Sequence, residues 1–228
     1  MTAVLDRLEK EQKFPVVIFE NVKGCTHPVV TNVHADAERL FRAIGVNSGG
    51  VKAFLKEYGD REMQEIPPVT VSEGPVQEVV LTGDDIDVTK LPLLTYHELD
   101  AGRYVTCGMS IMRDPDTDVL NAGIYRLMIH DETSFGTQIS ETAHGHYIMK
   151  AHEKRDQPCP MAVVIGHHPA FYLGALSFTS LETDELNVVG GILGEPLEMV
   201  KCKTLDLEVP AHAEMVLECE ILPHERKL

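Results

Sequence analysis

The chain has no tryptophan, no CxxC pair, no long apolar run and few basic residues among its 228 positions. Its 20 lysines and arginines stand against 36 aspartates and glutamates, which gives a formal charge of −16. Such a surface repels phosphate backbones, so a nucleic-acid-binding function is excluded. A membrane span needs about 18 consecutive apolar residues, and no segment approaches that length, so no membrane contact is expected.

The cysteines and the first residues indicate the compartment. The five cysteines are odd in number and scattered, which fits neither a disulfide framework nor a structural zinc site. The opening MTAVLDRLEKEQKF is charged and lacks the apolar core of a signal peptide. We therefore expect reduced thiols and a cytoplasmic protein.

Residues 1–65 predict a small αβ unit. The continuous apolar run at 16–19 is typical of a strand buried on both faces. From Asp36 the apolar residues recur with the helical period, and glycines can end each helix. The charged, proline-rich stretch 61–74 predicts a linker. The expected elements are strands at 16–19 and 28–33 and helices at 36–45 and 48–59, the second capped by Ser48.

Residues 66–228 are dominated by predicted strands. The turn-forming cluster 114–118 separates two long apolar segments and predicts a long antiparallel hairpin. The fold class is therefore α+β: the αβ unit is followed by a mainly antiparallel, split-barrel-like sheet with flanking helices. The expected strands are 76–81, 103–114, 119–131, 161–166, 200–209 and 213–222, and the expected helices are 144–155 and 184–193.

Two polar residues stand out in the motif NAGIYR. Asn121 and Arg126 are five positions apart, so on one strand they face opposite sides unless a bulge or twist at Gly123 intervenes. A glycine within a strand often marks the close approach of a ligand. The alternative is that Asn121 closes the preceding turn and Arg126 is a solvated strand arginine.

Histidines are numerous and form two close groups. The chain has 11, including His144 and His146 in HGH and the adjacent pair His167 and His168. Alternating histidines can bind one metal ion, but no HExxH motif is present. Most of the histidines are therefore expected on the surface or hydrogen-bonded in the core.

An acidic group precedes the glycine-containing segment NVVGGILGE. A carboxylate among Glu182, Asp184 and Glu185 could bind a hard cation, and the glycines allow close approach of a phosphate. The segment does not match GxGxxG, so as a phosphate-binding motif it is weak.

Taken together, the motifs resemble the UbiD family of decarboxylases, which use prenylated FMN. The matching segments run in order from FPVVIFENVKG through LLTYHELDAGRYVTCGMSIMRDPDT, NAGIYRLMIHD, PCPMAVVIGHHPA and DELNVVGGILGEP to VPAHAEMVLECEILP. They cover nearly the whole chain. The combination of NxGxYR with ExxxxGxxxGEP is much more specific than either motif alone.

The resemblance implies a site. Its metal ligands are Asn121, His144 and Glu185, which bind Mn²⁺ or Mg²⁺ and through it the flavin phosphate; the nitrogen ligand favours Mn²⁺. A K⁺ site would use Glu185 and backbone carbonyls, and Arg126 would face the substrate carboxylate. A flavin prenyltransferase would supply the cofactor. The implied cofactor-binding residues are Asn121, Ala122, Ile124, Tyr125, Arg126, His144, Ala175, Ser177 and Glu185.

The resemblance does not extend to the family's catalytic motif and C-terminal domain. The family's EGPFGE-like motif, which carries the catalytic glutamates, and its C-terminal domain are expected to follow PHERKL, where this chain stops. The first hypothesis is the cofactor-binding portion, residues 66–228 with the αβ unit 1–65, of a decarboxylase of aromatic or α,β-unsaturated acids. The second is a flavin-binding subunit that needs a partner chain. The third, a metal-dependent hydrolase, would use His97 or His146. Full-length members of the family form homo-oligomers, which leaves this chain a monomer or part of a heteromer.

Overall fold

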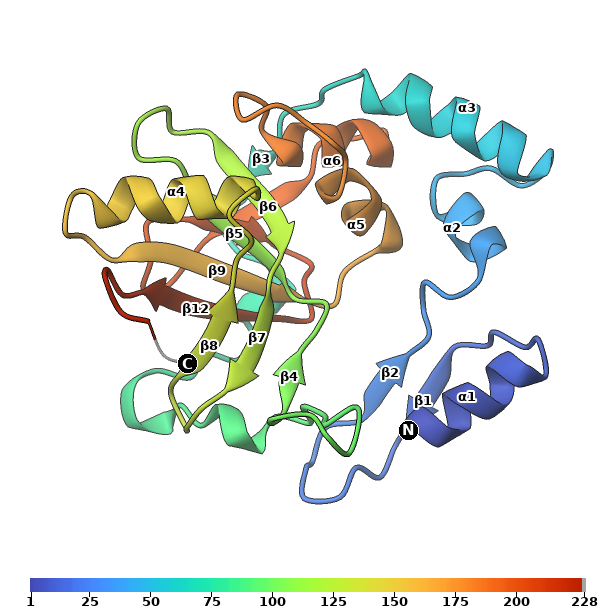
Figure 1. The fold of residues 1–228 in the computed structure, drawn as a ribbon. Coiled ribbons are helices and arrows are strands. Elements are labelled where there is room, and N and C mark those ends of the chain that lie inside the picture. The colour runs from blue at the N-terminus through green and yellow to red at the C-terminus, as the bar shows by residue number, and fades with distance from the viewer. Residues whose placement is uncertain (227–228) are drawn as a thin grey trace.

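The computed structural model describes residues 1–226 and has the expected α+β architecture (Figure 1). Within these residues no helix is long and apolar enough to cross a membrane. The helices are α1 (Thr2–Lys10), α2 (Ala37–Ala43), α3 (Gly50–Glu62), α4 (His144–Glu153), α5 (Pro169–Ala175) and α6 (Glu185–Leu193). The strands are β1 (Val17–Phe19), β2 (Val29–Thr31), β3 (Val69–Thr70), β4 (Tyr104–Val105), β5 (Met109–Arg113), β6 (Leu120–Ile124), β7 (Arg126–Ile129), β8 (Phe135–Gln138), β9 (Cys159–Ile165), β10 (Glu198–Lys201), β11 (Glu208–Pro210) and β12 (Met215–Ile221).

The predicted hairpin forms, but its two arms are divided between two sheets. β5 and β6 belong to a four-stranded antiparallel sheet in the order β12-β9-β5-β6, whereas β4 and β7 belong to the sheet β4-β7-β8. The register changes between the pairs Val105↔Leu127 and Met109↔Ile124, which leaves one extra residue on the first arm. This bulge lets both arms leave one sheet and enter the other, as in a split barrel that does not close.

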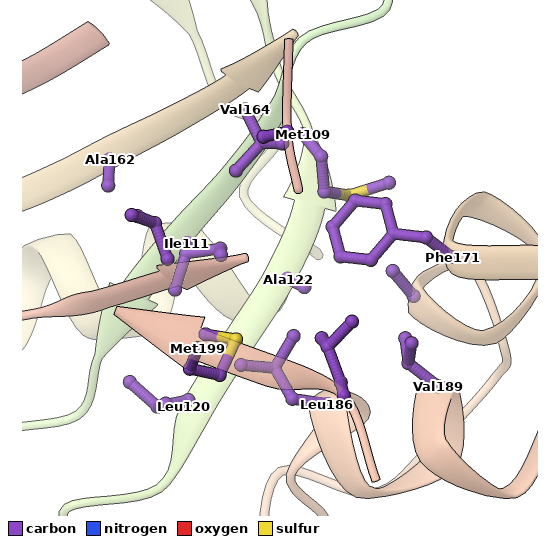
Figure 2. Packing of buried hydrophobic residues seen from close by; sticks show 14 of the residues in the cluster. Met109, Ile111, Leu120, Ala122, Ala162, Val164, Phe171, Leu186, Val189 and Met199 are labelled. Atoms are coloured by element: carbon purple, nitrogen blue, oxygen red, sulfur yellow. The ribbon is translucent and has the colours of Figure 1, made fainter. Parts of the chain in front are cut away.

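The four-stranded sheet is buried on both faces. Neighbouring residues of β9 point to opposite sides, because Ala162 and Val164 join one apolar cluster while Met161 and Val163 join another. The first cluster fills the space toward α5, α6 and β10 (Figure 2). The second lies toward α4, which crosses the opposite face (Figure 1). The sheet therefore serves as a rigid platform for the amino-terminal ends of α4 and α6.

The N-terminal unit departs from prediction in two respects. Among residues 1–226, β1 pairs with β2 alone, and Ile18 is 60% exposed, so the expectation of a strand buried on both faces is wrong. A two-stranded sheet is too small to bury both of its faces, even when its residues are apolar. The residue that caps α3 is Gly49, with a φ of 87°, and not Ser48 as expected. The helix does not end at Gly59 but continues to Glu62, because a glycine inside a helix costs only about 1 kcal/mol.

Three other segments also differ from prediction. Residues 76–81 form no strand: a 3-10 turn at Pro75–Gln77 precedes exposed backbone. Residues 200–209 form the hairpin β10–β11, and Glu218 accepts hydrogen bonds from backbone N–H groups in its turn. The expected linker 61–74 is packed on the protein, because β3 pairs with β10 and Ile66 N donates to Asn187 O at 3.0 Å. Hydrophobicity and proline content alone could not show these tertiary contacts.

Candidate functional site

Three side chains far apart in the sequence converge beside the four-stranded sheet. Asn121 lies on β6, His144 is the first residue of α4, and Glu185 is the first residue of α6. Glu185 Oε1 is 3.1 Å from Asn121 Nδ2 and 3.3 Å from His144 Nδ1. All three residues line one small recess, together with Asp114 and Thr183 among others. The predicted metal ligands are thus brought together.

The Glu185 carboxylate is buried but well supplied with donors. Its residue is 3% exposed, and burial of an unpaired carboxylate would be costly. Oε1 accepts from Asn121 Nδ2 and from Thr179 Oγ1 at 2.9 Å, and Oε2 accepts from Ala122 N at 3.2 Å. The position at the start of α6 adds a favourable helix dipole, and Asp184 caps this helix by accepting from Leu186 N. These contacts fix the carboxylate in one orientation.

Asp184 provides a second carboxylate near the recess. Burial raises its pKa above the usual range of an aspartate, and the neighbouring charge of Glu185 acts in the same direction. The hydrogen bond from Leu186 N opposes these effects. Two carboxyl groups therefore lie next to each other at this end of α6, and burial together with the charge of Glu185 disfavours the ionised form of Asp184.

Tyr125 connects the strand and the helix that carry two of the three side chains. Its hydroxyl donates to Asn121 Oδ1 at 3.1 Å and accepts from Gly145 N at 2.9 Å. Burial raises its pKa, so the hydroxyl keeps its proton at neutral pH. The resemblance implied only that the backbone here lines the flavin, and this role of the side chain was missed. The glycines of NAGIY and HGH are the signal that could have revealed it, because both face the Tyr125 ring.

The other expected site residues lie around this centre. Arg126 is exposed at the start of β7, in a different sheet from Asn121, and its guanidinium lies 5.9 Å from the centre of the Tyr104 ring. Ile124 ends β6. Ala175 ends α5, and Ser177 Oγ is 2.6 Å from Tyr58 Oη.

The chemistry of these groups suits a divalent cation. They offer an amide oxygen, an imidazole nitrogen and a carboxylate, a mixed set that matches Mn²⁺ or Mg²⁺. Asn121 Oδ1 has two lone pairs, of which Tyr125 occupies one. Among residues 1–226 no three His, Cys, Asp or Glu side chains are arranged to hold a metal ion, so such a site here depends on the Asn121 amide. His97 and His146 do not line the recess, and His97 lies on an exposed turn.

Comparison with known proteins decides the family. Residues 68–228 match the Rift-related domain of 3-octaprenyl-4-hydroxybenzoate carboxy-lyase, and residues 1–58 match the N-terminal domain of the same enzyme. The chain belongs to the UbiD family. The family expected from the motifs is thereby confirmed.

Solved structures of UbiD-class enzymes share the fold. HmfF from Pelotomaculum thermopropionicum, in complex with FMN, is 36% identical and superimposes with a TM-score of 0.90, covering 98% of this chain and 50% of its own. The vanillic acid decarboxylase of Sedimentibacter hydroxybenzoicus in its closed form is 30% identical, with a TM-score of 0.92 over 99% of this chain and 50% of its own. An evolved dimeric form of HmfF is in complex with prFMN. The α+β split-barrel-like fold is thus confirmed.

The curated relatives are longer than this UbiD-family chain. An uncharacterized protein of Aquifex aeolicus is 32% identical over 92% of this chain but only 46% of its own length. Another, sll0936 of Synechocystis, is 30% identical over the same shares. The chain spans about half the length of the curated relatives it matches.

Proposed function

We propose that the chain is the flavin-binding portion of a carboxy-lyase that acts reversibly on aromatic or α,β-unsaturated carboxylic acids. The observation that carries the proposal is the convergence of Asn121, His144 and Glu185 on one recess. The similarity to HmfF, which is in complex with FMN and in an evolved form with prFMN, supports a flavin as the cofactor.

In this proposal the three side chains would hold Mn²⁺ or Mg²⁺, whose positive charge would attract the phosphate of prenylated FMN or FMN. A K⁺ ion would use Glu185 and the backbone carbonyls of Ala122, Ala175 and Ser177. The bound flavin supplies the electron sink that decarboxylation needs. The chain's own contribution is to place groups: the donors around Glu185 hold its carboxylate in one orientation, and the backbone of residues 124–126 would lie along the flavin.

Arg126 would bind the carboxylate of the substrate. Its guanidinium is exposed and therefore free to make a bidentate contact, and it remains charged at all physiological pH values. The Tyr104 ring, whose centre lies 5.9 Å from the guanidinium carbon, contacts the cation without neutralising it. Substrate would thus be oriented by a cation, with the carboxylate that departs as CO₂ held beside the flavin.

A second candidate is a flavin-binding subunit that requires a partner chain. One observation favours it: the similar vanillic acid decarboxylase, designated ShVdcCD, has a structure with a truncated ShVdcD. In both cases we expect a flavin prenyltransferase to supply the cofactor. Assays of CO₂ release by the chain alone and with proteins encoded beside it would separate the two candidates.

The test is metal and flavin content after co-expression with a flavin prenyltransferase. We expect Glu185→Ala and His144→Ala to lose bound manganese and most of the flavin, because each removes a ligand. Arg126→Ala should retain both and lose turnover. His212→Ala, in an exposed loop, serves as the matched histidine control. Equal manganese and flavin contents in all four variants would contradict the proposed roles.

A further inference from the structure

We infer that the Tyr125 hydroxyl is a positioning group that fixes Asn121 and His144 relative to each other. The inference rests on the proposed function, because both residues are proposed metal ligands. Tyr125 itself does not line the recess. It acts from behind the site, through the amide of one ligand and the backbone next to the other.

A single oxygen atom makes the connection. The Tyr125 residue is 8% exposed, and its hydroxyl donates to Asn121 Oδ1 at 3.1 Å. The same oxygen accepts from Gly145 N at 2.9 Å, and Gly145 directly follows His144 in α4. The ligand on β6 and the ligand at the start of α4 are therefore coupled through one side chain, although 23 positions separate them.

Two glycines make room for this hydroxyl. A Cβ atom placed on Gly145 would lie 2.5 Å from Tyr125 Oη, and one on Gly123 would lie 2.8 Å from it. Neither glycine has a positive φ, so the backbone at these positions does not itself require glycine. The close approach of the tyrosine explains both, and it ties the motifs NAGIY and HGH to one physical cause.

The direction of the hydrogen bonds is fixed as well. Gly145 N–H can only donate and Asn121 Oδ1 can only accept, so the hydroxyl accepts from the first and directs its proton to the second. Asn121 Nδ2 in turn donates to Glu185 Oε1. The amide is thus held at both ends, and the second lone pair of Oδ1 is left for a cation.

Removal of the Tyr125 hydroxyl should weaken the positioning of the proposed metal ligands without leaving a cavity in the core. Tyr125→Phe keeps the ring between the glycines but leaves Asn121 Oδ1 and Gly145 N without this partner. Groups that orient metal ligands typically account for about 10- to 100-fold in metal affinity. We therefore expect at least about tenfold weaker Mn²⁺ binding.

The experiment is a titration of the full chain with Mn²⁺, followed by electron paramagnetic resonance of free and bound ion. The matched control is Tyr172→Phe, which removes another buried hydroxyl that accepts from a backbone N–H, that of Gly166. We expect Tyr125→Phe to weaken Mn²⁺ binding and alter the bound-ion spectrum, with Tyr172→Phe unchanged. Gly145→Ala, which crowds the hydroxyl from the helix, should weaken binding in the same sense.

Three outcomes would overturn the inference. Mn²⁺ affinity of Tyr125→Phe within twofold of the unaltered chain would show that the hydroxyl does not position the ligands. Equal losses in Tyr125→Phe and Tyr172→Phe would show a general effect of lost hydroxyls. If the unaltered chain itself bound no Mn²⁺, the proposed function would fail first and the inference with it, so the two failures are distinguishable.

Discussion

Acid should destabilise the protein through His167, which lies in GHHP between β9 and α5. Its ring packs on Phe171, with 4.7 Å between ring centroids, and its Nδ1 is buried without a hydrogen-bond partner. Burial lowers the pKa of His167 from 6.5 to about 4, and the neighbouring charges of His168 and His212 act in the same direction. The ring is therefore neutral in the folded protein at pH values where it is charged in the unfolded chain.

The sign and size of the effect follow from this difference in pKa. Above about pH 6.5 the ring is neutral in both states and adds no pH dependence. Between 6.5 and about 4 the unfolded chain binds the extra proton, so the free energy of unfolding falls as pH falls. At about 1.4 kcal/mol per pH unit, the full loss approaches about 3 kcal/mol near pH 4. That is a large part of the roughly 5–15 kcal/mol typical of a domain.

Urea unfolding measured between about pH 7 and pH 4.5 would test this prediction. His167→Phe keeps a ring against Phe171 but cannot titrate, so its stability should fall less steeply than that of the unaltered chain. His97→Gln, on an exposed turn, should follow the unaltered chain. If His167→Phe lost as much stability over this range as the unaltered chain, the argument from burial would be refuted.

Three further predictions concern contacts at named positions. Thr179→Val removes a donor to Glu185 and should weaken Mn²⁺ binding severalfold in a titration, whereas Thr179→Ser should not. Gly190→Ala should cost about 1–3 kcal/mol in urea unfolding, because its Cβ would lie 2.1 Å from Ile66 O; a normal midpoint would show that this segment shifts freely. Ile18→Thr should change stability by less than about 0.5 kcal/mol, and a larger loss would show that β1 is covered.

Strands were predicted best from the sequence where the apolar residues of a segment are also buried in the structure. β9 and β12 were expected because apolar residues run through both segments, and the structure covers both faces of their sheet. Where the apolar residues are exposed, the prediction was wrong. Residues 79–81 are apolar yet exposed, and Ile18 lies in an apolar run but is 60% exposed. A run of apolar residues reports hydrophobicity, whereas burial depends on distant parts of the chain.

The candidate site was harder to predict from local pattern. Asn121, His144 and Glu185 lie on three separate elements, so no spacing rule links them, and the family resemblance supplied the set. The change of sheet at Tyr125 arises from a register shift of one residue between two strand pairs. That shift depends on pairing partners rather than on the residues of either strand.

The charge of the recess gives a physical reason why a cation belongs to the proposed function. Asp114 and Glu185 line the recess, no lysine or arginine does so among the described residues, and half-buried Asp184 lies next to Glu185 in the sequence. Such a site would repel the phosphate of a flavin, as would the whole chain with its charge of −16. A divalent ion held by Glu185 would offset the charge of the two carboxylates and give the phosphate a cation to contact. The acidity that is expected to repel nucleic acid therefore makes metal-mediated binding the consistent way for this fold to hold the proposed anionic cofactor.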